Sequence, residues 1–199
     1  MFWKNLSLRK MSEHHDLSGE KKLQLLVLCD RKGHQIGTAT RQDCHQGDGK
    51  THLAFMAYVL DRDGKLILGK RGKSKTLWPL FWDASVVSHV LPGETPQISA
   101  KRRVKEELAI DVDFTLFGSF FYQVRQNGHS ENEFCYLLKG QSETLPQKNP
   151  VEISQIKKVS LKDFSKFYNS EKKNFTPWFI IANGRFPLEG LLWQKNIKP

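Results

Sequence analysis

Cysteine is scarce in this chain, and long hydrophobic runs are missing. The 199 residues include three cysteines, Cys29, Cys44 and Cys135. This small, odd number argues against a disulfide scaffold and favours reduced thiols in a cytoplasmic protein. No apolar run approaches the length that spans a membrane, and the opening MFWKNLSLRKM lacks the apolar core of a signal peptide. No internal repeat or low-complexity segment is visible.

Acidic residues are outnumbered by basic ones. Lysine and arginine total 31 against 21 acidic residues, which gives a net charge of +10. This excess favours anionic ligands, although net charge affects the approach of a ligand more than the fold. The lysines are scattered rather than interleaved with aromatic residues on one element, which argues against a nucleic-acid-binding protein.

The length fits one domain with a substantial core. We expect residues 1–22 to form a basic N-terminal tail and residues 23–199 to form that single domain. Strands are predicted at 23–30, 35–41, 52–61, 65–71, 114–124, 131–140 and 154–160, and helices at 161–168 and 175–184. Tight hairpin turns are predicted at 62–64 and 126–128, and a polar loop at 42–52. The expected fold is a mixed α/β or α+β domain, with mostly antiparallel strands and a few helices on the faces of the sheet.

A further helix is predicted just after Thr95, which can act as its N-cap, with Pro96 in the first turn. Ala100, Val104 and Leu108 recur every fourth residue and form an apolar face that can dock on a sheet. The neighbouring face carries two arginine–glutamate pairs at the same spacing, Arg102 with Glu106 and Arg103 with Glu107. For this helix alone, a solvated charged surface is the simpler interpretation.

Other residues that could bind a metal favour a functional role for this charged helix face. His89 and Glu94 precede the helix and can converge on one end of it. Glu131 and Glu133 are two residues apart on a predicted strand, so their carboxylates share a face. Like charges side by side are unfavourable unless a cation or an arginine lies between them. Each histidine alone is more often a surface or core residue than a ligand. With the two glutamates, His45, His52 and His89 would form a mixed nitrogen and oxygen site suited to zinc, manganese or iron, with magnesium possible.

Gly93-Glu94 followed by RRVKEEL resembles a Nudix box, a loop–helix motif that holds divalent cations against a diphosphate. Carboxylates neutralise the metal, and the metal bridges phosphate oxygens. The chain departs from the motif at three positions. Ser88, Arg103 and Ala109 stand where the pattern has glycine, glutamate and glycine.

A second resemblance covers more of the chain, from about Leu25 to Phe186. Seven ordered segments, CH…HLAF, KRGKSKTLWP, W…SH, GE, RRVKEEL, ENEFC and FTPWF, resemble the type 1 isopentenyl-diphosphate isomerases, a branch of the Nudix superfamily. The resemblance implies a Nudix-like fold and a metal-dependent enzyme that interconverts isopentenyl and dimethylallyl diphosphate. It also accounts for Arg103, because an arginine is the family's residue there.

The resemblance implies roles for individual residues. It implies that a first metal, Mn²⁺, Zn²⁺ or Mg²⁺, is held by five side chains: His45, His52, His89, Glu131 and Glu133. Glu107 would help to hold a Mg²⁺ on the substrate diphosphate. Four basic residues would bind that diphosphate: Arg41, Arg71, Lys75 and Arg103.

Isomerisation needs two acid/base groups across the substrate, because one carbon gains a proton and another loses one. By resemblance, Glu133 assisted by Tyr122 is one of these groups. Trp178 matches a tryptophan that closes the pocket and faces a developing carbocation. The family's second group is a cysteine two residues before His89. Val87 stands there in this chain, and valine can neither donate nor accept a proton.

Two alternatives to an isomerase follow from Val87. One is a Nudix hydrolase of a nucleoside or prenyl diphosphate, and the other is a non-catalytic protein that binds metal and prenyl diphosphate. In each case the partner is a small diphosphate. The sequence does not define the oligomeric state.

Overall fold

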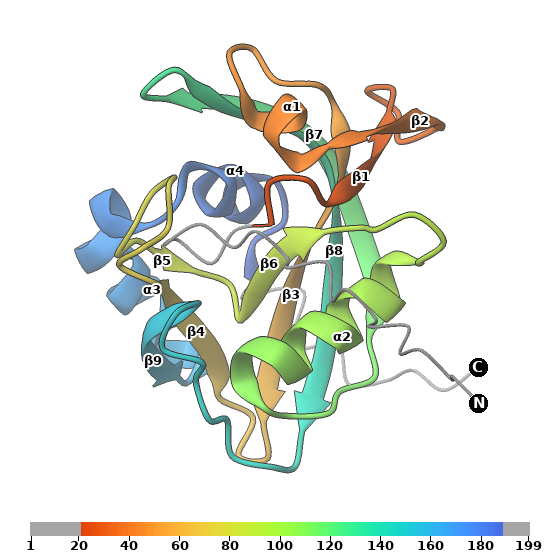
Figure 1. The fold of residues 1–199 in the computed structure, drawn as a ribbon. Helices are drawn as coiled ribbons and strands as arrows, with labels where there is room; N and C mark the ends of the chain where they lie inside the picture. The colour runs from red at the N-terminus through yellow and green to blue at the C-terminus, as the bar shows by residue number, and fades with distance from the viewer. Residues whose placement is uncertain (1–20, 189–199) are drawn as a thin grey trace, which may run out of the picture.

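The central strand of the sheet is β3, His52–Asp61 (Figure 1). In the computed structural model, which describes residues 21–188, β3 pairs in antiparallel fashion with β1 (Leu25–Cys29), β4 (Leu66–Arg71) and β6 (Val86–His89). It pairs in parallel with β8 (His129–Ser142). Because β6 and β8 both pair with β3, residues of three strands meet at its N-terminal half.

The other strands extend this framework through antiparallel pairs. β2 (Gln35–Thr40) pairs with β1, β7 (Thr115–Gln126) pairs with β8, and β5 (Trp82–Asp83) and β9 (Ile153–Val159) pair with β4. At the β7–β8 turn, Asn127 has φ 51° and Gly128 has φ 76°, the two positive values of a type I′ turn. The expectation of a mixed, mostly antiparallel fold is confirmed.

Four α-helices lie within the described residues: α1 (Arg41–His45), α2 (Pro96–Leu108), α3 (Leu161–Glu171) and α4 (Pro177–Arg185). A 3₁₀ turn, Lys172–Asn174, follows α3. The prediction of a polar loop at 42–52 was wrong in its first half, because α1 lies there. The Thr40 side chain accepts a hydrogen bond from the Asp43 amide and starts this short helix.

The alternation of side chains along β3 separates two hydrophobic cores. Leu53, Phe55 and Ala57 point to the face covered by α2. The predicted apolar stripe of α2 docks there, with Ala100, Val104 and Leu108 at 0% exposure. Ala54, Met56 and Tyr58 point to the opposite face, where Phe164 of α3 and Trp178 and Phe179 of α4 complete the core. The functional side chains described below lie at the edge of this second core.

The two ends of α2 differ in backbone strain. Thr95 Oγ1 accepts a hydrogen bond from the Ile98 amide at 3.3 Å, and Pro96 is in the first turn, as predicted. At the other end Ala109 has φ 55° and ψ 31°, a left-handed conformation. Glycine adopts this conformation without a Cβ clash, which explains why the Nudix pattern has glycine there.

We expect Ala109→Gly to stabilise the domain by about 0.5 kcal/mol. It removes about 1–2 kcal/mol of left-handed strain, and the added entropy of the unfolded chain offsets about 0.4–1 kcal/mol. Urea unfolding followed by circular dichroism measures the change. Lys105→Gly, inside the helix, is the control and should destabilise by about 1 kcal/mol. An Ala109→Gly variant no more stable than the parent would contradict this account of the helix end.

The described part of the chain contains no helix long and apolar enough to cross a membrane. Cys29, Cys44 and Cys135 are buried free thiols. The predicted N-terminal tail falls outside the described residues except for its last two positions.

Candidate active site

Five buried side chains from four elements converge at the N-terminal end of β3. They are His45 at the end of α1, His52 at the start of β3, His89 at the end of β6, and Glu131 and Glu133 on β8. One potential ligand atom from each lies within 4.8 Å of the others. The three imidazole ring centroids are 4.9–5.0 Å apart. The structure therefore brings together the five residues that the sequence assigned to a first metal.

Strand register explains this convergence. His52 lies opposite Glu133 in the parallel β3–β8 pair, and Ala54 lies opposite His89 in the antiparallel β3–β6 pair. Positions two apart on a strand share a face, so Glu131 joins Glu133 on the same side. Three strands thus deliver four of the five side chains to one point, and α1 supplies the fifth, His45.

The proton positions on two histidines are set by backbone carbonyls. Nδ1 of His45 bonds Arg41 O at 2.7 Å, and Nδ1 of His52 bonds Lys50 O at 2.7 Å. A carbonyl only accepts, so each Nδ1 donates, and the neutral ring presents the lone pair of Nε2. These two atoms face Glu131 Oε2 at 3.0 Å and Glu133 Oε1 at 3.3 Å.

Those facing atoms are suited to a cation. His45 Nε2, His52 Nε2 and Glu131 Oε2 are buried without a hydrogen-bond partner. A lone pair facing a carboxylate is repelled unless the ring is protonated or a cation lies between them. Burial disfavours the charged form of His45, yet Glu131 raises its pKa overall. The chemistry of this donor set fits a divalent metal bound by imidazole nitrogen and carboxylate oxygen.

His89 is oriented by an arginine instead of a carbonyl. Arg41 Nη1 donates to His89 Nδ1 at 3.1 Å, and His89 Nε2 lies 3.2 Å from Glu133 Oε1. Burial, reinforced by the positive charge of Arg41, lowers the pKa of His89 well below its usual value. The uncharged ring therefore directs Nε2 at Glu133.

Glu133 also lines a small cavity of about 40 Å³ beside the histidines. Tyr122 lies opposite Glu133 in the β7–β8 pair, and its hydroxyl donates to Glu133 Oε2. Val87 lies opposite Met56 in the β3–β6 pair and lines the same cavity. Because β6 and β8 flank β3, Val87 and Glu133 enter this cavity from different strands.

Trp178 forms another part of the cavity wall and is almost completely buried, at 2% exposure. Its ring packs edge-on against Trp78, with centroids 5.1 Å apart, and the Arg71 guanidinium lies 5.1 Å from its centre. Arg71 was predicted to bind diphosphate. The structure shows its Nε and Nη2 donating to the carbonyls of Leu77 and Trp78 at 2.8–3.2 Å.

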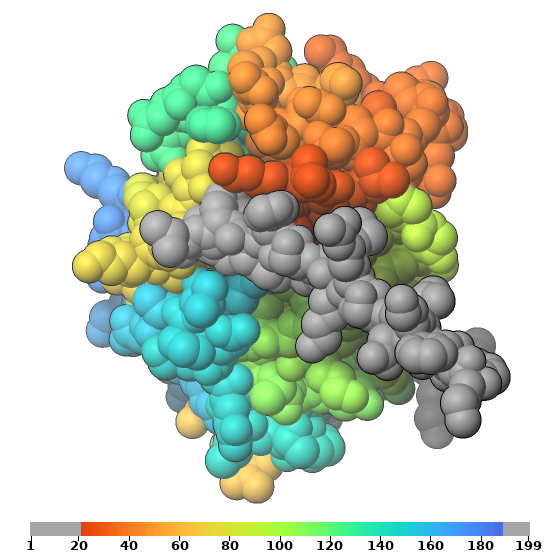
Figure 2. Space-filling view, viewed as in Figure 1, coloured from red at the N-terminus to blue at the C-terminus, as the bar shows by residue number. Residues whose placement is uncertain are grey.

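A larger basic cavity of about 330 Å³ adjoins this region. Its charged lining residues are Lys21, Arg41, Lys75, Arg102, Arg103, Glu106 and Glu152. Figure 2 shows the segments that supply them, orange-red near residue 21, green in α2 and cyan near residue 150, on one face of the molecule. Five positive and two negative side chains give the cavity a net positive lining that suits a phosphorylated ligand.

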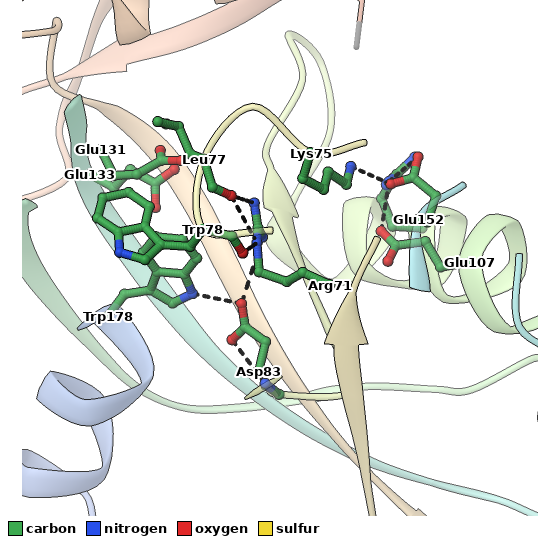
Figure 3. A network of polar contacts seen from close by, with 12 residues as sticks. Arg71, Lys75, Leu77, Trp78, Asp83, Glu107, Glu131, Glu133, Glu152 and Trp178 are labelled. Carbon is green, nitrogen blue, oxygen red and sulfur yellow. Dashed lines mark hydrogen bonds and ion pairs between the residues drawn. The ribbon is translucent and has the colours of Figure 1, made fainter. Parts of the chain in front are cut away.

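Glu152 organises two of these cations and was not singled out in the sequence. Its carboxylate bonds Lys75 Nζ (Figure 3). It also lies 3.1 Å from Arg103 Nη2. Against the effect of burial, Lys75 and Arg103 lower the pKa of Glu152. Arg103 also contacts Glu107 at 2.6 Å. Glu107 is thus buried beside the basic cavity, and it lies outside the five-residue His/Glu cluster.

The expected convergence of Glu94 with His89 was wrong. Glu94 accepts hydrogen bonds from Arg102 at 2.8 and 2.9 Å and from Ser99 at 2.5 Å, and it is not part of the His/Glu cluster. This two-point contact fixes the loop before α2 onto the helix. The signal for it was available in the sequence, because Arg102 lies two helical turns after Glu94.

Comparison with known proteins identifies the family. The model of the NUDIX domain matches residues 50–179. An isopentenyl-diphosphate Delta-isomerase of Photorhabdus laumondii is 32% identical over 176 residues, which cover 87% of this chain and 99% of the relative. This chain belongs to the isopentenyl-diphosphate Delta-isomerase family of NUDIX proteins.

Another relative and two solved structures are similar to this chain over most of its length. A protein of the same name from Haloarcula marismortui is 30% identical over 183 residues and covers 87% of this chain and 97% of its own. Among solved structures, a Deinococcus radiodurans protein superimposes with a TM-score of 0.58 at 22% identity, covering 74% of this chain and 91% of its own. A MutT protein from Methanosarcina mazei gives 0.56 at 18% identity, covering 68% and 92%. These two structures share the fold.

The three cysteines of this chain are buried thiols with raised pKa values. Burial raises the pKa of Cys44 to about 11 and that of Cys29 to about 12. Burial also raises the pKa of Cys135 well above its usual value, and this residue is at 0% exposure. A thiol acts as a base through its thiolate, so these buried cysteines are poor proton acceptors near neutral pH.

Proposed function

We propose that this protein is a metal-dependent isopentenyl-diphosphate isomerase-like enzyme with low intrinsic activity. The observation that carries the proposal is the Glu133–Tyr122 pair, held at a small cavity between the His/Glu cluster and the basic cavity. A diphosphate in the basic cavity would direct its C5 chain toward that pair. Family membership supports the same substrate class.

The basic residues would bind the diphosphate, and the His and Glu residues would bind metal ions. Arg41, Lys75 and Arg103 line both the basic and the small cavity and would bind the diphosphate. His45, His52, His89, Glu131 and Glu133 would hold a divalent metal, Mn²⁺, Zn²⁺ or Mg²⁺. Glu107 would contribute to a Mg²⁺ on the diphosphate. Such ions would supply positive charge that neutralises the carboxylates and the diphosphate.

Proton transfer is where this chain departs from its family. Glu133, through Tyr122, can exchange a proton with one carbon of the substrate, and the Trp178 ring can face the positive charge that forms. The second carbon needs its own acid/base group, and Val87 supplies none. We therefore expect isomerisation in both directions to be slow.

Specific observations bear on the two alternatives. Hydrolysis by a Nudix box depends on a cluster of free carboxylates, whereas Arg103 here contacts Glu106 and Glu107 at 2.6 Å. This makes a hydrolase the weaker candidate. A non-catalytic prenyl-diphosphate-binding protein is favoured by Val87 and needs no other change to the site.

Deuterium exchange separates the three functions. The protein is incubated with isopentenyl diphosphate and Mg²⁺ plus Mn²⁺ in heavy water, and carbon-bound deuterium is followed by NMR. Slow exchange into both C5 diphosphates supports the isomerase. Release of phosphate or pyrophosphate supports the hydrolase, and calorimetric binding with neither reaction supports the binding protein.

The state of the cysteines bears on the location of the protein. All three cysteines are buried free thiols, as in reducing compartments. We accordingly propose a cytoplasmic location and a small diphosphate as the partner.

A further inference from the structure

Asp83 is a buried carboxylate beside the active site to which neither the sequence nor the proposed reaction assigns a role. It ends the two-residue strand β5, and its side chain is 6% exposed. Its Oδ1 accepts a hydrogen bond from the Ala84 amide at 2.9 Å. Its Oδ2 accepts the Trp178 indole N–H at 2.8 Å and lies 3.7 Å from Arg71 Nη1 (Figure 3).

These contacts place Asp83 at the junction of two parts of the cavity wall. Trp178 comes from α4, and Arg71 comes from the end of β4. Both line the small cavity, and the guanidinium lies against the Trp178 ring. One carboxylate thus holds the edge of the indole and the end of the guanidinium in a fixed relation.

The same arginine supports a strained segment of backbone. Trp78 and Leu80 have φ of 45° and 62°, which non-glycine residues rarely adopt. Such conformations persist only where surrounding contacts hold them. Arg71 provides such contacts through its bonds to the carbonyls of Leu77 and Trp78. The Trp78 ring, held in this way, packs edge-on against Trp178.

The charge environment of Asp83 is simple. Arg71 is the positive group that faces it, whereas Tyr58 from β3 and Cys135 from β8 face it as neutral groups, because burial raises the pKa of both. Burial raises the pKa of Asp83 to about 7, although Arg71 acts in the opposite direction. The Asp83–Arg71 ion pair is therefore complete above pH 7 and weakens as the pH falls through 7.

We propose that Asp83 is a positioning residue, which holds the Trp178 indole and the Arg71 guanidinium in place in the wall of the small cavity. The role of Asp83 in catalysis rests on the proposed function. Its contacts with Trp178 and Arg71 do not depend on that function. The Arg71 guanidinium is held in one orientation in this wall, since three of its nitrogens face carbonyls or Asp83.

The network can be tested without enzymatic activity. The five tryptophans are labelled with ¹⁵N in the indole ring, and Trp178→Phe identifies the Trp178 signal. In the wild type, we expect this signal to shift between pH 6 and 8 with a midpoint near pH 7, since the Asp83 pKa is raised to about 7. In Asp83→Asn the signal should remain, because the amide oxygen still accepts the N–H, but its pH dependence should disappear.

A matched control is Asp61→Asn. Asp61 is also a buried acid on a strand, 1% exposed, but its partner is Lys158 at 3.0 Å on β9. This variant should leave the Trp178 titration unchanged. A Trp178 signal with the same position and the same pH dependence in the wild type and in Asp83→Asn would overturn the proposal.

The catalytic consequence is measured in the Val87→Cys background, where turnover is expected to be higher. There Asp83→Asn should lower kcat by at least about tenfold and change KM less, because the Trp178 ring that Asp83 holds faces the reacting chain rather than the diphosphate. The acidic limb near pH 7 of the rate profile should also be lost. An unchanged kcat would refute the positioning role, even if the NMR titration showed the network. If the isomerase proposal itself is wrong, Val87→Cys will be inactive before Asp83 is changed. That result is distinguishable from a failure of the positioning role or of the network.

Discussion

Val87→Cys is expected to raise the isomerisation rate by about 100-fold to 10,000-fold, the range typical of one positioned acid/base group. The substitution changes side-chain volume little, and Val87 already lines the small cavity with Glu133. Arg41, Lys75 and Arg103 line the same cavity, and such cations lower the pKa of a nearby thiol. Deuterium incorporation into isopentenyl diphosphate, compared between variant and wild type, measures the gain.

Val87→Ser is the matched control. It introduces a polar group of similar size whose pKa is too high for ready proton exchange, so its rate should stay near that of the wild type. If Val87→Cys folds, binds metal and gains no activity, Val87 does not occupy the position of the missing acid/base group.

Glu133→Gln is expected to have the second large effect, the loss of both metal and proton transfer. Glu133 Oε1 lies 3.3 Å from His52 Nε2 and 3.2 Å from His89 Nε2, and Oε2 accepts the Tyr122 hydroxyl. The glutamine amide carries no negative charge to bind a metal beside the histidines. It also cannot accept a proton beside Tyr122. Metal affinity should fall by at least about 100-fold. The exchange rate in the Val87→Cys background should fall by at least about 1,000-fold.

Tyr122→Phe separates these two roles. It removes the hydroxyl that contacts Glu133 but leaves all five cluster side chains in place. Calorimetry should show nearly unchanged metal affinity, while the exchange rate falls. If Glu133→Gln retains full metal affinity, this glutamate is not a ligand, and the metal is held by the histidines and Glu131 alone.

Much of the architecture was predictable because it depends on local patterns. The apolar spacing of α2, the cap at Thr95 and the Asn127-Gly128 turn each act over a few residues, and the structure contains all three. The convergence of His52, His89 and Glu133 required only that the right strands be neighbours, and the family resemblance supplied that information.

The contacts that escaped prediction connect distant parts of the chain. Asp83 and Trp178 are 95 residues apart, and no periodic pattern relates a two-residue strand to a tryptophan in the last described helix. Glu152 meets Lys75 at a separation of 77 residues. The resemblance assigned Arg71 to the diphosphate and said nothing of its contacts within the protein. Its bonds to Leu77 and Trp78 depend on a left-handed backbone that the sequence around Pro79 does not reveal.

The parallel pairing of β3 with β8 has a consequence for how the protein folds. His52 and Glu133 are adjacent in space but about 80 residues apart in the chain, so this ladder closes a long loop, and such contacts form slowly. The cluster cannot exist until β3, β6 and β8 have docked. A metal that binds there would recognise only the completed domain, and its binding free energy would add directly to the stability of the native state.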